Sequence, residues 1–160
     1  MKHNHDSDAD SSSDSLRSMA IGATLHCLTG CALGEIVGLI VGTVAGLSNS
    51  ATIVLSIALA FLFGYSLSLL PLRRSGLPLA RAMRLVLAAD TLSIATMEII
   101  DNAVMLVVPG AMNAGVVNPI FWASMALALS AAFYAALPVN LYLLKHGQGH
   151  ALMHKHHERH

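Results

Sequence analysis

The sequence LHCLTGCALGE, residues 25–35, lies within an apolar run that extends from about residue 19 to residue 47. A helix needs roughly 20 residues to cross a bilayer, so this run predicts a membrane span. Residues four apart share one face of a helix, and two such rows follow the span. One row is mostly glycine: Gly22, His26, Gly30, Gly34, Gly38, Gly42 and Gly46. The row beside it carries two thiols and a carboxylate: Cys27, Cys31 and Glu35.

The glycine row predicts a close helix contact, because a surface without side chains lets a second backbone approach. We expect this groove to seat either the third span or the first span of a neighbouring copy. A single four-helix copy leaves little room for a translocation path. Because the glycine row would let two copies pack together, we expect a homodimer or larger assembly. Four residues would form its interface: Gly30, Gly34, Gly38 and Gly42.

The composition is that of a membrane protein. Of the 160 residues, 55% are hydrophobic and 11% are charged, against roughly 25% charged residues in soluble domains. The formal net charge is zero and no basic stripe exists, so we expect membrane lipid around the chain and no nucleic-acid partner. The two cysteines do not make a secreted disulfide framework, and a pair four apart in one helix is poorly oriented to bridge itself.

The fold class predicted from the apolar runs is all-α, a transmembrane four-helix bundle between two polar tails. Residues 1–18 are acidic and serine-rich and cannot bury apolar surface, so we expect a disordered tail. The membrane domain covers residues 19–144 and contains four predicted spans: about 19–47, 51–71, 82–108 and 119–144. Pro71 ends the second span, and Pro138 should kink the fourth. Residues 145–160 form a histidine-rich tail.

The arginines predict the orientation in the membrane. The connection between the second and third spans contains Arg73, Arg74, Arg81 and Arg84, whereas the other two connections contain no Lys or Arg. By the positive-inside rule this connection is cytoplasmic. With four spans, both termini are then cytoplasmic as well, and we expect a multi-pass protein of the bacterial inner (plasma) membrane.

Four carboxylates lie inside the predicted spans: Glu35, Asp90, Glu98 and Asp101. No Lys or Arg lies well inside a span to pair with them. A charge at the middle of a bilayer costs about 2.5–3.5 kcal/mol on insertion scales. Protonation, water in a cavity or a bound cation must offset that cost.

The third span places its acidic residues on one helix face, together with two methionines: Asp90, Ile94, Met97, Glu98, Asp101 and Met105. Depths can be compared between spans at about 1.5 Å per residue. On this basis we expect Cys31 near the depth of Asp90 to Ile94, and Glu35 near the depth of Glu98. The thiols and carboxylates would then form a ladder through the bilayer.

The ligand types on this ladder indicate a metal ion or protons. Soft sulfur ligands favour Cu(I) and also suit Zn(II), whereas carboxylates suit harder ions and protons. We therefore predict a metal site with copper favoured over zinc, and the candidate ligands are Cys27, Cys31, His26, Glu35, Glu98, Asp101, Met97 and Asp90. Each candidate also has a plainer interpretation. The cysteines could be small buried hydrophobes, His26 could bond a backbone carbonyl, Met97 could be packing, and Asp90 could be hydrated.

The two tails carry further candidate metal ligands. His3 stands in position three, where a free terminal amine, two amides and the imidazole can form a square-planar Cu(II) or Ni(II) site. The C-terminal tail contains clustered imidazoles that bind Cu(II), Ni(II) or Zn(II), and its candidates are His150, His154, His156 and His157. The plainer interpretation is a chelating tail with no specific role.

Several linked motifs resemble a family of small bacterial four-span membrane proteins that is known only as a domain of unknown function. The motifs are His26-Cys27-x3-Gly30-Cys31-x2-Gly34-Glu35, Met97-Glu98-x2-Asp101-Asn102, Asn118-Pro119-x-Phe121-Trp122, Pro138-Val139-Asn140 and Gly149-His150-Ala151. The resemblance covers about residues 25–154. It implies a four-helix membrane domain, and some relatives occur in a copper-related setting, which mildly favours copper. It implies no catalytic residue.

Three functions therefore compete. The first is metal-ion binding and transport, with copper as the transported ion, either alone or in exchange for protons. The second is a membrane thiol redox protein that uses Cys27 and Cys31, although redox pairs usually have two intervening residues at a helix start, not three in mid-helix. The third is a structural or assembly protein whose protonated carboxylates bond across helices. The first is favoured, and an enzymatic role is not.

Overall fold

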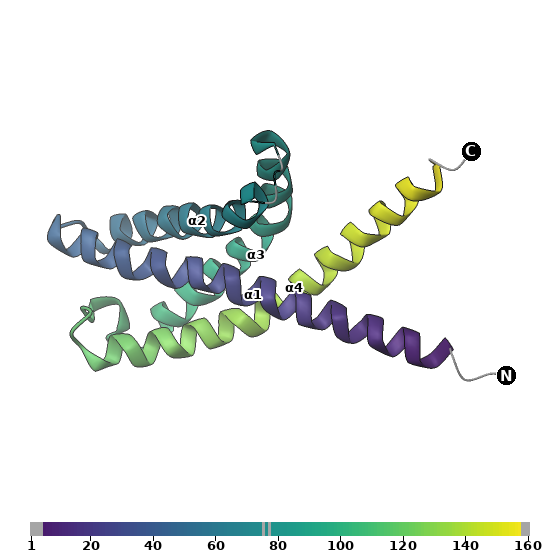
Figure 1. Cartoon of the computed structure of the whole chain (residues 1–160). Coiled ribbons are helices and arrows are strands. Elements are labelled where there is room, and N and C mark those ends of the chain that lie inside the picture. Colours follow the sequence, from purple (N-terminus) through teal and green to yellow (C-terminus); the bar gives the residue numbers. More distant parts are fainter. Residues whose placement is uncertain (1–4, 75, 77, 158–160) are drawn as a thin grey trace.

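The computed structural model describes residues 5–74, 76 and 78–157. It contains four long helices and one short 3-10 helix, and no strand occurs in this part of the chain. The all-α fold class is thereby confirmed (Figure 1). The elements are α1 (His5–Val44), α2 (Asn49–Arg74), α3 (Leu79–Val107), η1 (Ala111–Asn113) and α4 (Pro119–His157).

Three segments in the described part of the chain are long and apolar enough to cross a membrane: Asp14–Val44, Asn49–Leu70 and Pro119–His146. The chain is therefore a multi-pass membrane protein by helix length and hydropathy. Its fourth long helix, α3, has 29 residues but carries Asp90, Glu98 and Asp101. Length and composition by themselves do not make α3 a span.

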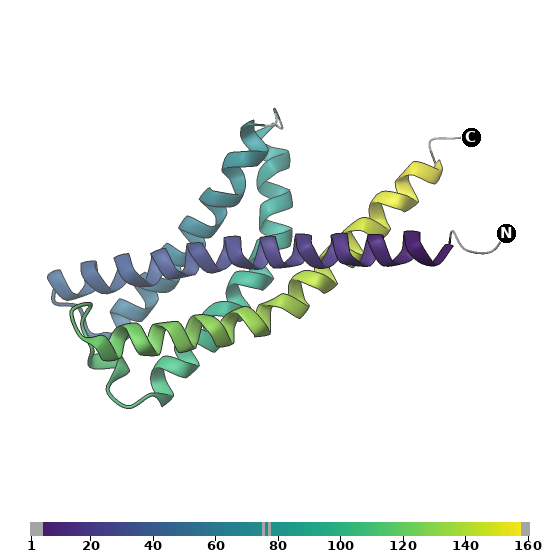
Figure 2. The ribbon, with the colours of Figure 1, turned by 60° about the horizontal axis from the view of Figure 1, so that its bottom comes forward.

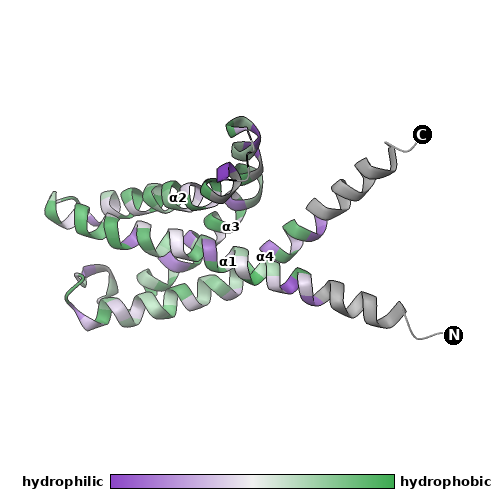
Figure 3. Ribbon diagram, viewed as in Figure 1, coloured by the Kyte–Doolittle hydropathy of each residue, from purple (hydrophilic) through white to green (hydrophobic). Residues whose placement is uncertain are grey.

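The outward surfaces of the helices are apolar, as contact with lipid requires. On α2 the exposed fractions of Val54, Leu62 and Leu70 are 66%, 58% and 51%. Figure 3 shows α2 as mostly apolar, with hydrophilic residues gathered where α2 ends and α3 begins. These side chains would face hydrocarbon at no cost, whereas in water they would form an unusually large apolar surface.

The helices place the two termini and the α2–α3 connection away from the other two connections. Figures 1 and 2 both show the termini on one side, here called the terminal end, and the α1–α2 turn and the α3–α4 connection on the other, here called the connection end. The most extensive contacts join α1 to α2 and α3 to α4. Smaller contacts of α1 with α3 and α4 close the bundle.

The glycine row is occupied by α2 of the same chain. A Cβ atom on Gly30 would lie 2.7 Å from the Cα atom of Gly64, and one on Gly38 would lie 2.6 Å from the Cα atom of Ser56. A Cβ atom on Gly34 would overlap the backbone of Ala60. The expectation that this row seats the third span or a second copy was therefore wrong. The short α1–α2 turn places α2 of the same chain against the row. A homo-oligomer stays a prediction, and it would need another surface.

Replacing Gly34 with alanine is expected to destabilise the bundle, because the added methyl meets the α2 backbone, which cannot rotate away. Overpacking of this kind costs about 1–3 kcal/mol. The matched control is Gly22→Ala, since a Cβ atom on Gly22 meets nothing within 4 Å. Thermal unfolding of the purified protein in detergent should show a lower midpoint for Gly34→Ala only. Equal midpoints for both variants would contradict the close α1–α2 contact.

The helices extend further than the predicted spans. Helix α1 begins at His5, within the tail that we expected to be disordered, and acidic residues in its first turns suit a helix N-terminus. Helix α2 continues through Pro71 to Arg74, because a proline near the end of a helix removes few of its backbone bonds. Helix α4 contains Pro138 and runs on to His157. Figure 2 shows α4 changing direction along its length, as expected for an internal proline.

Small residues on α4 complete the interior. A row at four-residue spacing is buried along this helix: Ser124, Ala128, Ala132, Ala136 and Asn140. The alanines let α1 and α3 approach closely, and Ala132 and Ala136 pack in one cluster with Cys27, Cys31 and Met97. A second cluster, formed by Ala114, Phe121 and Met125, lies between α4 and the α3–α4 connection. Polar side chains are arranged around these two clusters.

Candidate cation site in the helix bundle

Two sulfur atoms from different helices meet in the interior. The Cys31 thiol of α1 lies 4.0 Å from the Met97 sulfur of α3, and the exposed fractions of these residues are 1% and 0%. Metal–sulfur bonds measure about 2.3 Å, so two sulfurs at this distance can share one ion with an angle of about 120°. Cys27 lies one helical turn away, is equally buried and, like Cys31, is a free thiol.

A buried carboxylate lies directly beside this sulfur pair. Glu98 is 4% exposed and follows Met97 on α3, close to the Cys31 thiol. The Asn102 side-chain amide donates to the Glu98 carbonyl oxygen at 2.8 Å and reaches the Glu98 Oε2 atom at 3.5 Å. The Oε1 atom of Glu98 has no hydrogen-bond partner. A thiol, a thioether and a negative group therefore share one buried space.

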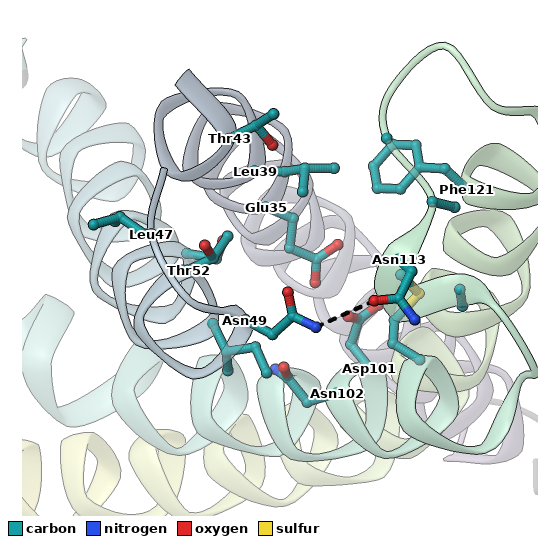
Figure 4. Close-up of a pocket in the computed structure, with 16 residues that line it drawn as sticks. Glu35, Leu39, Thr43, Leu47, Asn49, Thr52, Asp101, Asn102, Asn113 and Phe121 are labelled. Carbon is teal, nitrogen blue, oxygen red and sulfur yellow. Dashed lines mark hydrogen bonds between the residues drawn. The ribbon is translucent and has the colours of Figure 1, made fainter. Parts of the chain in front are cut away.

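Two further carboxylates meet toward the connection end. Glu35 of α1 and Asp101 of α3 line the same pocket. Asp101 is 3% exposed. One oxygen of each group, Glu35 Oε1 and Asp101 Oδ1, is buried without a partner. Figure 4 shows both side chains directed into the same pocket.

The terminal end of the interior holds the other two ionisable candidates. Asp90 of α3 lies near Ser68 and His26. Cys27 lies near Ser93 on α3. The Nε2 atom of His26 and the Oδ2 atom of Asp90 are buried without partners. These residues extend the row of buried polar side chains from the sulfur pair toward the terminal end.

Every buried side-chain atom that lacks a partner in the described residues belongs to a predicted ligand: His26, Glu35, Asp90, Glu98 and Asp101. No Lys or Arg occurs between residues 18 and 72 or between residues 85 and 144 to pair with them. Unpaired buried charges are costly, and protonation, water or a cation must satisfy them. All of these atoms are buried inside the bundle.

The predicted ligands form a column with three levels and not one compact site. His26 and Asp90 form the first level, the sulfurs and Glu98 the second, and Glu35 with Asp101 the third. In the described part of the chain, no three His, Cys, Asp or Glu residues converge as a ready-made metal site. The relative depths also differ from expectation: Cys31 is level with Met97 and Glu98, and Glu35 with Asp101, about one turn from the predicted pairing.

A family model described as "Domain of unknown function (DUF4396)" matches residues 17–149. The chain belongs to the DUF4396 family. The match confirms the resemblance drawn from the linked motifs, and it contains all eight predicted ligands inside the spans. No curated protein matches the chain, and no solved structure does. The function of this DUF4396 chain must therefore be argued from its interior.

The candidate ligands in the two tails lie outside the DUF4396 match, which ends at residue 149. His3 is outside the described residues, and the side chains of the C-terminal candidates are also outside the described part: His150, His154, His156 and His157. Their metal binding stays a prediction. The backbone of residues 147–157 continues α4.

One polar group of the DUF4396 interior was missed by the sequence analysis. The Asn140 side-chain amide of α4 donates to the Thr24 hydroxyl of α1 at 2.8 Å and to the Ser93 hydroxyl of α3 at 3.0 Å. All three residues are buried. This node joins three helices next to Cys27. The four-residue row on α4 that ends at Asn140 could have indicated it, but neutral side chains do not stand out against an apolar background.

Proposed function

We propose that this DUF4396 chain is a four-span protein of the inner (plasma) membrane that binds and moves a monovalent copper ion. The observation that supports it is the buried Cys31–Met97 sulfur pair beside the unpaired carboxylate of Glu98. A thiol and a thioether select soft ions, and Cu(I) is the common soft ion in biology. Glu98 would balance its positive charge in a bundle interior that contains no Lys or Arg.

Copper is favoured over zinc by the number of available ligands. Structural zinc sites use four tetrahedral ligands, and catalytic sites use three protein ligands. The described residues bring together no three His, Cys, Asp or Glu side chains. A Cu(I) ion would be held by Cys31 and Met97, with Cys27 one turn away as the next sulfur. Glu35 and Asp101 would then pass the ion onward or move protons in exchange.

The distribution of side chains on α3 supports its role as the fourth span. Its carboxylates face the interior, whereas Leu92, Ile99 and Leu106 are 51%, 69% and 66% exposed. An apolar outer face with a polar inner face suits a helix that lines a path through lipid. The four arginines around the α2–α3 connection then place the terminal end, with both termini, in the cytoplasm.

The burial of both thiols disfavours the alternative of a thiol redox protein. Cys27 is 2% exposed and Cys31 is 1% exposed. Disulfide exchange requires an attacking thiolate to reach the sulfur in line. A partner thiol cannot reach these atoms without opening the bundle, whereas a small ion needs only a narrow path.

Cu(I) stoichiometry of the reduced full-length protein tests this proposal. The Cys27→Ser/Cys31→Ser variant should bind one ion fewer per chain, because serine oxygen is a poor ligand for a soft ion. A variant that ends at Lys145 is the control, since it removes the tail histidines and should keep the ion in the bundle. Unchanged Cu(I) stoichiometry and affinity in the double cysteine variant would contradict the proposal.

A further inference from the structure

The connection end of the bundle contains a pocket that the sulfur pair does not use. Its volume is about 290 Å³, enough for several water molecules. The α1–α2 turn and η1 border it, and Asn49 at the start of α2 donates to Asn113 of η1 at 3.3 Å. Figure 4 shows Glu35 and Asp101 inside this pocket, with Asn49, Asn102 and Asn113 around them.

The pocket has an unsatisfied acidic wall. Asp101 lines the pocket and is 97% buried, and its Oδ1 atom has no hydrogen-bond partner. Glu35 lines the pocket from α1, and its buried Oε1 atom also has no partner. Two adjacent carboxylates repel each other when both are ionised, and neither Lys nor Arg nor His lines the pocket. The wall therefore attracts a cation from the aqueous phase.

The chemistry of the lining selects a different class of cation from the sulfur pair. Apart from the thioether of Met105, its polar groups are carboxylates, amides and hydroxyls, the last including Thr52 and Ser56. Oxygen ligands suit hard ions such as Mg²⁺, Ca²⁺ and Mn²⁺. The two carboxylates supply two negative charges when both are ionised, and the volume leaves room for retained water, which Mg²⁺ in particular gives up reluctantly.

We infer that this pocket is a second cation site, which binds a hydrated hard divalent ion through Glu35 and Asp101. Its occupancy does not depend on the sulfur pair, because no atom is shared between the two sites. Its use as an outer step of a transport path rests on the proposed function.

The chain carries its own reporter for this pocket. Trp122 is its single tryptophan, and it stacks edge-on against Phe121, which lines the pocket, with ring centroids 5.2 Å apart. Its indole nitrogen donates to the Val116 carbonyl oxygen at 2.8 Å, which fixes it on the α3–α4 connection. A paramagnetic ion in the pocket should quench its fluorescence, whereas an ion on the tail histidines is at the other end of the molecule.

The experiment titrates Mn²⁺ into the full-length protein in detergent and follows Trp122 fluorescence. Saturable quenching that excess Mg²⁺ or Ca²⁺ reverses is expected. The Glu35→Gln and Asp101→Asn variants should each weaken it at least about 10-fold, since even outer-shell changes cost about 10–100-fold in metal affinity. Asp14→Asn is the control, because it removes an exposed carboxylate from α1 outside the pocket and should leave the titration unchanged.

Three results would overturn the inference: no saturable quenching in the unaltered protein, quenching that neither Mg²⁺ nor Ca²⁺ reverses, or equal loss in the Asp14→Asn control. The first two use the unaltered chain, so they do not depend on the folding of a variant. Cys31→Ser separates the inference from the copper proposal, since it should weaken Cu(I) binding at the sulfur pair and preserve the Mn²⁺ titration. Loss of Cu(I) binding with intact Mn²⁺ quenching would leave the second site standing alone.

Discussion

Replacing Met97 with leucine is expected to lower the affinity of the bundle for Cu(I) by at least about 100-fold. The substitution removes the sulfur that lies 4.0 Å from the Cys31 thiol and keeps the volume nearly constant. Changes to outer-shell partners already cost about 10–100-fold in metal affinity, so the loss of a direct ligand should cost at least the upper value. Competition with a colorimetric Cu(I) chelator under reducing conditions measures the affinity.

The matched control for this prediction is Met125→Leu. Met125 is also buried, with 3% exposure, but it belongs to the cluster with Phe121 and Ala114, away from the thiols. Both substitutions should cost less than about 1.5 kcal/mol of stability, because methionine and leucine are similar in volume. Only Met97→Leu should change Cu(I) affinity. Equal affinities for the two variants would show that Met97 is packing and not a ligand.

A double-mutant cycle strengthens this test. If Cys31 and Met97 bind the same ion, Cys31→Ser and Met97→Leu remove one shared interaction, and their effects on affinity should not add. If each sulfur bound copper at a separate place, the losses would be independent. Measured additivity within error would therefore contradict a shared site, even if each single substitution weakened binding.

The second large effect is expected from Glu98→Gln, which should reduce copper flux on the order of 100-fold. The carboxylate has a buried Oε1 atom without a partner beside Cys31. Placing a charge inside the bilayer costs about 2.5–3.5 kcal/mol, and 1.4 kcal/mol corresponds to a factor of ten in an equilibrium constant. Without this negative group, a Cu⁺ ion in the bundle would lose its counter-charge. Uptake of Cu(I), or of Ag(I) as its analogue, into proteoliposomes measures the flux.

The stability of the same variant separates transport from the structural alternative. Glutamine keeps the size and the hydrogen-bonding ability of a protonated carboxyl group, so a purely structural Glu98 should tolerate the change in every assay. For a transport role, the thermal midpoint should stay the same or rise while the flux falls. Glu98→Asp keeps the charge and should retain part of the flux. Unchanged copper flux in the Glu98→Gln variant would favour a structural role for Glu98.

The helical class and the acidic face of α3 could be predicted because they follow from local spacing. Apolar runs of sufficient length specify spans, and positions three or four apart share a face in any helix. The burial of Ile94, Met97, Glu98 and Asp101 confirms that this face points inward. The short α1–α2 turn, with Gly46 in a left-handed conformation at φ 66°, also agrees with the break expected after the first span.

The partners across helices could not be predicted from spacing. The relative height of α1 and α3 depends on how both helices tilt, and a shift of one turn moved Glu35 from the level of Glu98 to that of Asp101. The glycine row was identified correctly as a contact surface but was assigned to the wrong helix. A glycine groove can accept any helix that has small residues on the contacting face. Chain connectivity and the packing of all four helices together therefore decide which helix occupies it.

The sequence alone determined that this chain is helical, that it belongs in a membrane, and that acids and sulfurs occupy the inner faces of its helices. These properties depend on residue type and helical period, which act locally. Only the tertiary structure decided that Cys31 meets Met97, that Asn140 joins three helices, and that Glu35 and Asp101 share a pocket. Those contacts join residues on different helices, and their geometry is set by the packing of the whole bundle.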